Sequence, residues 1–540
     1  MKKNKIYILI IFIIALFTMM PMLTSEFCFG HDTEFHLTNI ISLTEQIKNN
    51  FLNPSRIVGN IGLNFGYATN IFYSPIVHMV TSYLNVLINN PIISIKLIHL
   101  ITLFISGLSM FFLSKRLSKS NEIGLVSSVI YMLFPYYTSD IYIREALSES
   151  FIFMFLPLIL LSLYELFSED GSIKRFYLLF IFGYVGGMLS HLTIMSYFTI
   201  IIFIYLIFNF KKTIKNLKHF IIASILIFGI TSPFLVGLFE HKLLGSYNVF
   251  KEGVMVQGTW GNALNPLDYI NVLKNFGNGE IKYFIDIITL ILLIITLIKF
   301  KKLTNKWYNA VLVFGIIGFI LSTKIFPWDI FPKSFRLIQF PWRFETFVSI
   351  SVSLIAPICL VDFKDKKTST IFIILSIFLL AQPNLRYAWN GDAKVDINNL
   401  NYYNGMGWQM EYLPVKTAEN IDYFNNRNHD IIIKENEGSI NIIKDDVPYL
   451  EFNVETDKNI TIELPRTYYI GYKLIDSNNN EIDIYEGEYG FIEANLSSGT
   501  YILNYTGTSY YNIARIVSLI SLILVIVVWR FYDKRNRTVL

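Results

Sequence analysis

The chain has 540 residues, of which 53% are hydrophobic and only 16% are charged, and its formal net charge is +4. Soluble domains carry about 25% charged residues, so this composition excludes an ordinary soluble enzyme. The two cysteines, Cys28 and Cys359, are too few for a disulfide framework or a cysteine-based metal site. We expect a polytopic membrane protein.

Apolar stretches long enough for transmembrane helices recur along the chain. Such a helix needs about 20 mostly apolar residues, because the hydrocarbon core is about 30 Å thick and a helix rises about 1.5 Å per residue. No cleavage site follows the first stretch, so we expect it to remain as a helix. The sequence predicts an all-α polytopic membrane fold of about 12 transmembrane helices, at residues 5–25, 92–113, 122–139, 150–167, 176–191, 193–210, 219–238, 283–298, 308–322, 344–361, 368–384 and 511–530.

The orientation follows from the basic residues, which favour cytoplasmic loops. With a cytoplasmic N-terminus, every even-numbered loop is basic. Segment 71–90 would invert this pattern if it crossed the membrane, so we interpret it as a helix that lies in or dips into the outer interface. We therefore predict a multi-pass protein of the bacterial cell membrane with both termini cytoplasmic and the active face outside. The basic loops and tail begin at Lys115, Lys174, Lys211, Lys299, Lys364 and Arg530.

Residues 385–510 differ from the rest of the chain. They contain 20 Asp and Glu residues against 9 Lys and Arg residues. Polar and apolar residues alternate near 459–464 and 501–505, which is typical of short antiparallel strands. We therefore divide the chain into a transmembrane catalytic domain (1–384), an extracytoplasmic β-rich domain (385–510), and a last helix with a basic cytoplasmic tail (511–540).

The first outer loop begins with Gly-His-Asp-Thr-Glu-Phe-His at residues 30–36. Asp32 and His36 share a face if the segment is helical, because they are four positions apart. A carboxylate just outside a span can act as a general base or hold a divalent cation. The alternative is that Asp32 only caps a helix over 33–49.

The next two outer segments also carry polar residues at the ends of apolar helices. Arg144, Glu145 and Glu149 precede the fourth span, where the alternative to a substrate site is an ion pair that anchors the helix. His191 lies at the junction of the fifth and sixth spans, and as a lone histidine among apolar residues it is more often a packing residue than a ligand.

Two arginines lie close together in the fifth outer loop. Arg336 and Arg343 flank the segment Ile-Gln-Phe-Pro-Trp at residues 338–342. A guanidinium group binds phosphate oxygens with two parallel hydrogen bonds, so both are candidates for an anionic substrate. The alternative is that both extend to lipid headgroups beside an interfacial Trp342.

Several function classes lack their motifs in this sequence. It contains no Walker A loop, no dinucleotide-binding glycine motif between a strand and a helix, and no His-Glu-x-x-His zinc motif. A nucleotide-driven pump is therefore excluded. Nucleic acid is not an expected partner, because no basic surface interleaved with aromatic residues is present.

These segments together resemble a known bacterial family. The opening at 30–36, the Arg144-Glu145 pair, the turn at His191 and above all Ile-Gln-Phe-Pro-Trp-Arg-Phe at 338–344 are similar to the 6-pyruvoyl-tetrahydropterin-synthase-related membrane proteins, a subset of the GT-C superfamily of glycosyltransferases. The family name refers to pterin chemistry, for which the sequence contains no support. The resemblance extends over nearly the whole chain.

The resemblance implies a mechanism. GT-C enzymes move a sugar from a polyprenyl-phosphate carrier to an acceptor on the outer face of the membrane. Mapped onto this chain, Asp32 and Glu34 are the catalytic acids, and Asp32 either deprotonates the acceptor or helps to hold a divalent cation (Mg or Mn). Arg343, together with Arg336, would neutralise the leaving polyprenyl phosphate. The other candidates would line the sugar or acceptor pocket: His36, Arg144, Glu145, Glu149 and His191.

Two other functions stay open at this stage. A transporter or flippase of lipid-linked sugars is compatible with twelve spans, although the ionisable residues gather at the outer mouth and not at the midplane. A non-catalytic scaffold for envelope assembly would bind its partners through 385–510. The expected partners of the enzyme are a polyprenyl-phosphate sugar donor, an envelope glycan or lipid acceptor, and membrane lipids.

Overall fold

The computed structural model describes most of the chain. The predicted span at 283–298, the end of the span at 368–384, the start of the acidic segment, Cys28 and Arg336 lie largely or wholly outside the described residues. The described residues are 2–24, 30–251, 263–266, 291–292, 294–295, 298, 306–330, 340–361, 365–376, 406–407 and 410–537.

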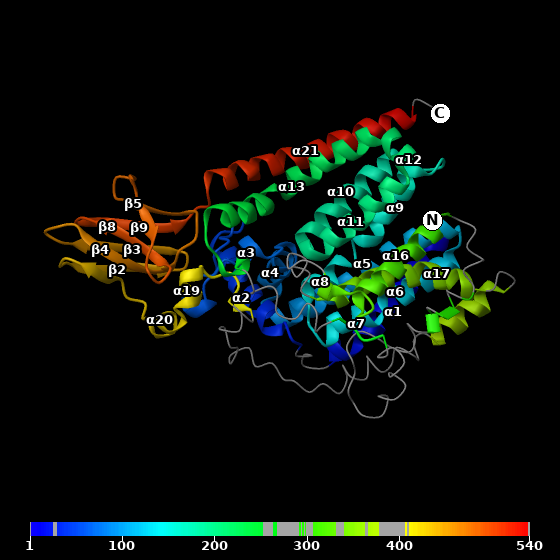
Figure 1. Cartoon of the computed structure of the whole chain (residues 1–540), viewed down its shortest axis with the longest axis horizontal. Helices are drawn as coiled ribbons and strands as arrows, with labels where there is room; N and C mark the ends of the chain where they lie inside the picture. The colour runs from blue at the N-terminus through cyan, green and yellow to red at the C-terminus, as the bar shows by residue number, and fades with distance from the viewer. Residues whose placement is uncertain are drawn as a thin grey trace.

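The transmembrane part is a bundle of helices (Figure 1). Within the described residues, seven helices are long and apolar enough to cross a membrane, judged by length and composition: Asn4–Leu23, Pro91–Ser118, Leu147–Phe167, Ile173–Ser190, Leu217–Leu244, Pro341–Leu360 and Ser509–Tyr532. The helices are α1 (Lys2–Thr24), α2 (Thr33–Asn49), α3 (Thr69–Phe72), α4 (Ile76–Ile88), α5 (Pro91–Ser118), α6 (Asn121–Met132), α7 (Pro135–Tyr142), α8 (Leu147–Ile152), α9 (Leu156–Phe167), α10 (Ile173–Ser190), α11 (Leu192–Phe208), α12 (Phe210–Lys215), α13 (Leu217–Leu244), α16 (Lys306–Ser322), α17 (Glu345–Leu360) and α21 (Ser509–Arg537).

Polar residues begin several of these helices. The Asn90 side chain accepts a hydrogen bond from the backbone N–H of Ile93, and Pro91 occupies the first helical position of α5. Ser120 begins α6 in the same way. These caps satisfy backbone donors that would otherwise be unpaired at a helix end.

Two predicted segments differ from simple spans. The stretch 122–139 is divided into α6 and α7, because Pro135 begins a new helix after the extended residue Phe134. The ambiguous stretch 71–90 contains α4, which has 13 residues and measures about 20 Å. A straight helix of that length is too short to cross the membrane, in line with its interpretation as an interfacial helix.

A β domain follows short helices α19 (Val415–Glu419) and α20 (Ile421–Asn426). One sheet has the strand order β1-β4-β8-β7 and the other has the order β2-β3-β9-β5-β6, with antiparallel pairing throughout. Apolar side chains of both sheets, such as Ile462 and Phe452, share one core. The strands are β1 (Ile432–Glu435), β2 (Ser439–Asp446), β3 (Tyr449–Glu455), β4 (Ile460–Thr467), β5 (Tyr472–Asp476), β6 (Glu481–Ile482), β7 (Ile484–Glu486), β8 (Phe491–Leu496) and β9 (Gly499–Tyr505).

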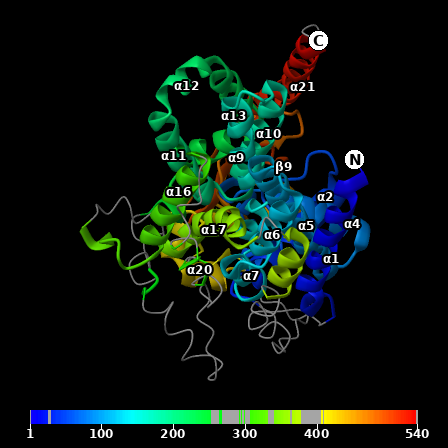
Figure 2. The same cartoon turned by 90° about the vertical axis from the view of Figure 1, so that its right-hand side faces the viewer.

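The β domain and the chain termini lie at opposite ends of the bundle (Figure 1). Helix α12, which carries Lys211, Lys212 and Lys215, lies at the end with the termini. Figure 2 views the molecule from that end, with α12 and α21 in the upper part and α7 in the lower part. This arrangement fits a topology with both termini on one side and the β domain on the other; that the termini are cytoplasmic stays a prediction.

The last helix, α21, packs closely along α13. A Cβ atom added at Gly229 of α13 would overlap the Ser521 hydroxyl and lie 2.9 Å from the Ser521 Cβ. The Ser518 hydroxyl donates a hydrogen bond of 2.8 Å to the Ile230 carbonyl at the same contact. A side chain at position 229 would therefore push the two helices apart.

We expect Gly229→Leu to destabilise the protein by about 1–3 kcal/mol, the usual cost of overpacking. Thermal unfolding of the detergent-solubilised protein, followed by helical circular dichroism, measures the change. Ile225→Leu is the control, because Ile225 lies on the same helix and is 65% exposed. Equal melting temperatures for the two variants would contradict the close packing.

Candidate functional site

The segment that carries Asp32 is fixed to the loop before α8. The backbone N–H of Asp32 donates to the Arg144 carbonyl over 2.8 Å, and that of His31 donates to the Ile143 carbonyl over 3.3 Å. A Cβ atom at Gly30 would lie 2.6 Å from the Arg144 carbonyl carbon, so only glycine permits this approach. Asp32 is thus placed by backbone contacts.

Asp32 does begin α2, as the capping alternative predicts, but its carboxylate accepts no capping hydrogen bond. Instead one carboxylate oxygen lies 3.9 Å from a guanidinium nitrogen of Arg144, and 43% of the Asp32 side chain is exposed. The carboxylate therefore remains accessible to a reactant while it faces a cation.

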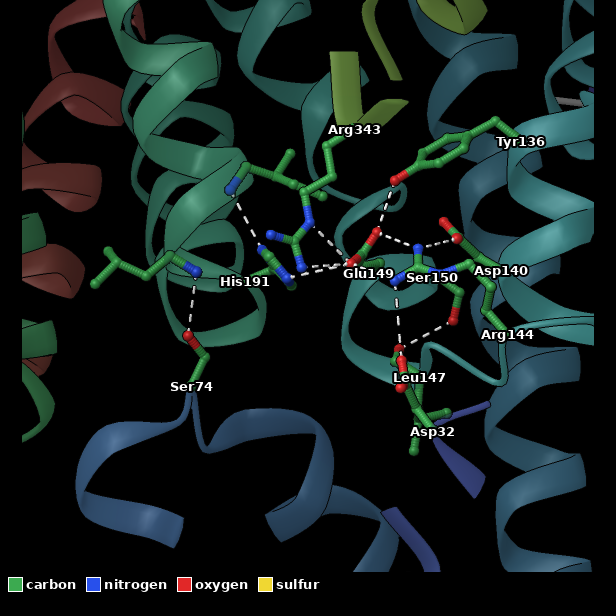
Figure 3. A network of polar contacts seen from close by, with 12 residues as sticks. Asp32, Ser74, Tyr136, Asp140, Arg144, Leu147, Glu149, Ser150, His191 and Arg343 are labelled. Carbon is green, nitrogen blue, oxygen red and sulfur yellow. Dashed lines mark hydrogen bonds and ion pairs between the residues drawn. The ribbon is translucent and has the colours of Figure 1, made fainter. Parts of the chain in front are cut away.

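Glu149 joins two arginines at the centre of the site (Figure 3). Arg144 donates to both of its carboxylate oxygens, over 2.7 and 2.9 Å. Arg343, from the short helix η6 (Pro341–Phe344), donates to one of them through Nε over 3.0 Å, and its NH2 lies 2.9 Å away. The structure thus brings together three of the residues predicted from the sequence.

Two further residues complete the cluster, and neither is among the predicted site residues. The Tyr136 hydroxyl donates to Glu149 over 2.6 Å, and Arg144 donates to Asp140 over 2.8 Å. Asp140 is fully buried on α7, and its second carboxylate oxygen has no hydrogen-bond partner within the described part of the chain. For Asp140, the sequence signal was its spacing of four residues from Arg144.

His191 lies at the edge of the cluster. Its Nε2 is 3.7 Å from the Glu149 carboxylate, and its Nδ1 accepts a hydrogen bond from the Ile194 N–H at the start of α11. The Ser74 hydroxyl connects this turn to the loop before α4, because it accepts from the Leu192 N–H over 3.1 Å. His191 therefore caps a helix and also faces the charged cluster.

Glu145 and His36 lie in a second layer of enclosed polar residues. Glu145 is fully buried and 2.8 Å from Nε2 of His99, while Nδ1 of His36 lies 2.8 Å from Nε2 of His78. No sequence pattern pointed to His78 or His99, which lie in apolar helices. Because Glu145 and His36 are enclosed, their contact with a substrate stays a prediction.

One other predicted residue, Glu34, is not among the contacts of the cluster. Glu34 lies two positions beyond Asp32, at the start of α2, and side chains two apart do not share a face of a helix. Its catalytic role therefore stays a prediction. Arg336 lies outside the described residues.

The cluster contains three carboxylates (Asp32, Asp140 and Glu149) and two guanidinium groups. The surrounding protein withdraws part of the water from the Asp32 carboxyl although 43% of the side chain is exposed, and this loss of hydration raises its pKa above the ordinary value; the negative charge of Glu149 adds to this effect. Arg144 lowers the same pKa but does not outweigh the burial. Asp32 is thus a stronger base than an ordinary aspartate.

A resident metal ion is poorly matched by these residues. Asp32 faces a guanidinium group, and no group of three or more Asp, Glu, His or Cys side chains in the described ranges is placed to hold a metal. We therefore derive no catalytic step through a metal.

The family is shown by a comparison with protein-family models. The model of the 6-pyruvoyl-tetrahydropterin synthase related domain, described as a membrane protein, matches residues 71–389. The chain belongs to this family. The matched range includes Glu149 and Arg343, whereas Asp32 precedes it.

Two individual proteins show weaker similarity. An uncharacterised protein of Lactococcus lactis subsp. cremoris (strain MG1363) is 26% identical over 336 residues, which are 60% of this chain and 54% of the relative. The chain thus spans about half the length of the curated relative that it matches. The cryo-EM structure of the arabinofuranosyltransferase AftD from Mycobacteria aligns with a TM-score of 0.45 and 11% identity, over 71% of this chain and 26% of that one. A similarity of this size does not establish a common activity.

We expect Glu149→Gln to destabilise the protein by about 3–5 kcal/mol, because it leaves two buried guanidinium groups without their shared partner. Glu145→Gln is the matched control, since Glu145 is equally buried but has a single histidine partner. Its expected cost is about 1–3 kcal/mol. Size-exclusion chromatography after heating measures how much of the main protein peak is lost, and so compares the stabilities of the two variants. Equal losses for the two variants would show that the ion pairs of Glu149 with two arginines stabilise the protein no more than the contact between Glu145 and His99 does.

Proposed function

We propose that this membrane protein is a glycosyltransferase of the GT-C type, which moves a sugar from a polyprenyl-phosphate carrier to a cell-envelope acceptor on the outer face of the membrane. The observation that carries the proposal is the partly exposed Asp32 carboxylate beside a cluster of buried charges. The cluster offers a base and a cation at one place, and both are needed for this transfer.

Asp32 is the general base of the proposed reaction. It accepts the proton of an acceptor hydroxyl, whose oxygen forms a bond to the anomeric carbon of the sugar. The bond between that carbon and the phosphate oxygen breaks, and the polyprenyl phosphate leaves with the electron pair. A base with a raised pKa suits this role, because general-base catalysis is most efficient when the pKa lies nearer the working pH.

Arg144 is the cation nearest to this base, 3.9 Å from the Asp32 carboxylate. In the proposed reaction it stabilises the charge that develops on the departing phosphate. Arg343 binds Glu149, the carboxylate that Arg144 also binds, and so holds Glu149 and through it Arg144. Arg343 is thus a positioning residue in this scheme.

We expect Asp32→Asn to lower transfer by a factor on the order of 10²–10⁴, the usual contribution of a general base. A deletion strain complemented with the wild-type or the variant gene tests this, with the envelope glycans analysed by mass spectrometry and NMR. Membrane insertion of both proteins is checked by immunoblotting of membrane fractions. A variant that restores the glycan as well as the wild type would refute the role of Asp32 and would favour a transporter.

We expect the pH profile of transfer to have an acidic limb set by Asp32. Only the ionised carboxylate accepts a proton, so activity falls as the pH drops through its pKa. Because that pKa is raised, the limb should lie above the value of about 3.9 of a free aspartate. Incorporation of labelled sugar by membranes of the complemented strain, measured between pH 4 and 8, locates the limb. An unchanged rate down to about pH 4 would contradict the assignment.

A further inference from the structure

A cleft of about 450 Å³ lies between the bundle and the β domain. Its lining comes from the end of α2 and the loop that follows, from the turn between β2 and β3, and from the end of β9 and the first turns of α21. The residues of the charged cluster around Asp32 do not line it. Ligand pockets commonly measure about 300–1,000 Å³, so the cleft has room for a ligand.

Asparagine side chains dominate one part of this cleft. Within the described residues, the side-chain amides of Asn53, Asn504 and Asn512 donate to no other residue and accept from none; the Asn53 bond to Asn50 is made by its backbone N–H. Each such amide has two donor hydrogens and one acceptor oxygen. A sugar hydroxyl also donates and accepts, so a row of free amides matches a saccharide.

Tyrosine rings form the other part of the lining. The guanidinium carbon of Arg56 lies 4.7 Å from the centre of the Tyr511 ring, and Arg56 is itself fixed by hydrogen bonds to the Asn70 carbonyl over 2.9 and 3.1 Å. Gly507 allows the chain to approach this ring, because its φ is +72° and a Cβ atom there would lie 2.6 Å from a ring carbon. The result is a rigid amphipathic surface on which the apolar face of a sugar ring can pack.

Two cations complete the cleft. Lys444 lies 5.1 Å from the centre of the Tyr449 ring, and Arg515 lies 6.0 Å from that of Tyr511. Within the described residues, neither of these cations donates a hydrogen bond to a protein acceptor. Arg56 and one carboxylate, Asp446, also line the cleft, so cations outnumber acids there and a phosphate or carboxylate substituent would be accepted.

We propose that this cleft binds a segment of an oligosaccharide that carries an acidic substituent. An anionic lipid is less well matched, since its chains need an apolar wall and the lining consists mainly of amides, hydroxyls and tyrosines. That the bound glycan is the acceptor rests on the proposed function. Helix α2 links the two sites, because Asp32 directly precedes its first residue and Asn49 at its end lines the cleft, about 25 Å away.

The full-length protein in phosphatidylcholine nanodiscs, applied to an array of microbial oligosaccharides, tests this proposal. We expect binding to acidic glycans, with the dissociation constant of the tightest one then measured in solution. Asn53→Trp fills the cleft from an exposed loop, and Arg515→Gln removes a cation; each should weaken binding about tenfold or more. Asn478→Ala is the control, because Asn478 is an exposed turn residue of the β domain outside the cleft.

Three results would overturn the proposal: no glycan bound above empty nanodiscs, equal binding by Asn53→Trp, or short-chain phosphatidylglycerol bound in place of any glycan. Asp32→Asn should bind the glycan as tightly as the wild type. This variant separates the two proposals, since retained binding with undiminished transfer refutes the role of Asp32 and leaves the cleft intact. Normal transfer with no glycan binding refutes the proposal for the cleft and leaves the role of Asp32 intact.

Discussion

The rest of the site depends on the ion pairs that the Glu149 carboxylate makes with two arginines. A buried charge is costly unless it is paired and hydrogen-bonded, and Glu149 is paired with two guanidinium groups. One of them, Arg343, is 194 positions away, so the pair ties α8 to the start of α17. The other, Arg144, offers its backbone carbonyl to the N–H of Asp32. The Glu149 carboxylate thereby ties α8 to α17. Through the backbone carbonyl of Arg144 it also helps to hold Asp32, the base of the proposed reaction.

The β domain is held against loops of the bundle by several specific contacts. The Gln46 side chain donates to the Val447 carbonyl over 2.8 Å, and the Thr467 N–H donates to the Phe65 carbonyl over 2.9 Å. The Tyr469 ring is stacked on Tyr247, with ring centres 5.7 Å apart. These contacts join the domain to the end of α2 and to two loops of the bundle. The cleft is therefore a fixed distance from Asp32, which a flexibly tethered domain would not provide.

The sequence predicted the class of the fold, and it selected several residues that the structure brings together, but not how they are arranged. Polar residues at the ends of apolar helices stand out, and this signal identified Asp32, Glu149 and Arg343. It could not show that Glu149 and Arg343 pair, because no local pattern reports a contact over 194 positions. The spacing also failed to show where Glu145 points. That residue has a φ of +52° just before α8 begins, so it turns to His99 although it is four positions from Glu149.

The charges of the cluster explain why a base and a phosphate site can lie side by side. With Asp32 ionised, its negative charge disfavours the approach of a phosphate to Arg144, which is 3.9 Å from the Asp32 carboxylate. Burial raises the pKa of Asp32, and the charge of Glu149 adds to this effect. When Asp32 takes the proton of the acceptor, it loses its negative charge while the departing phosphate gains one. In the proposed reaction, proton transfer to Asp32 thus removes a negative charge from beside Arg144 at the moment when the leaving group needs that cation.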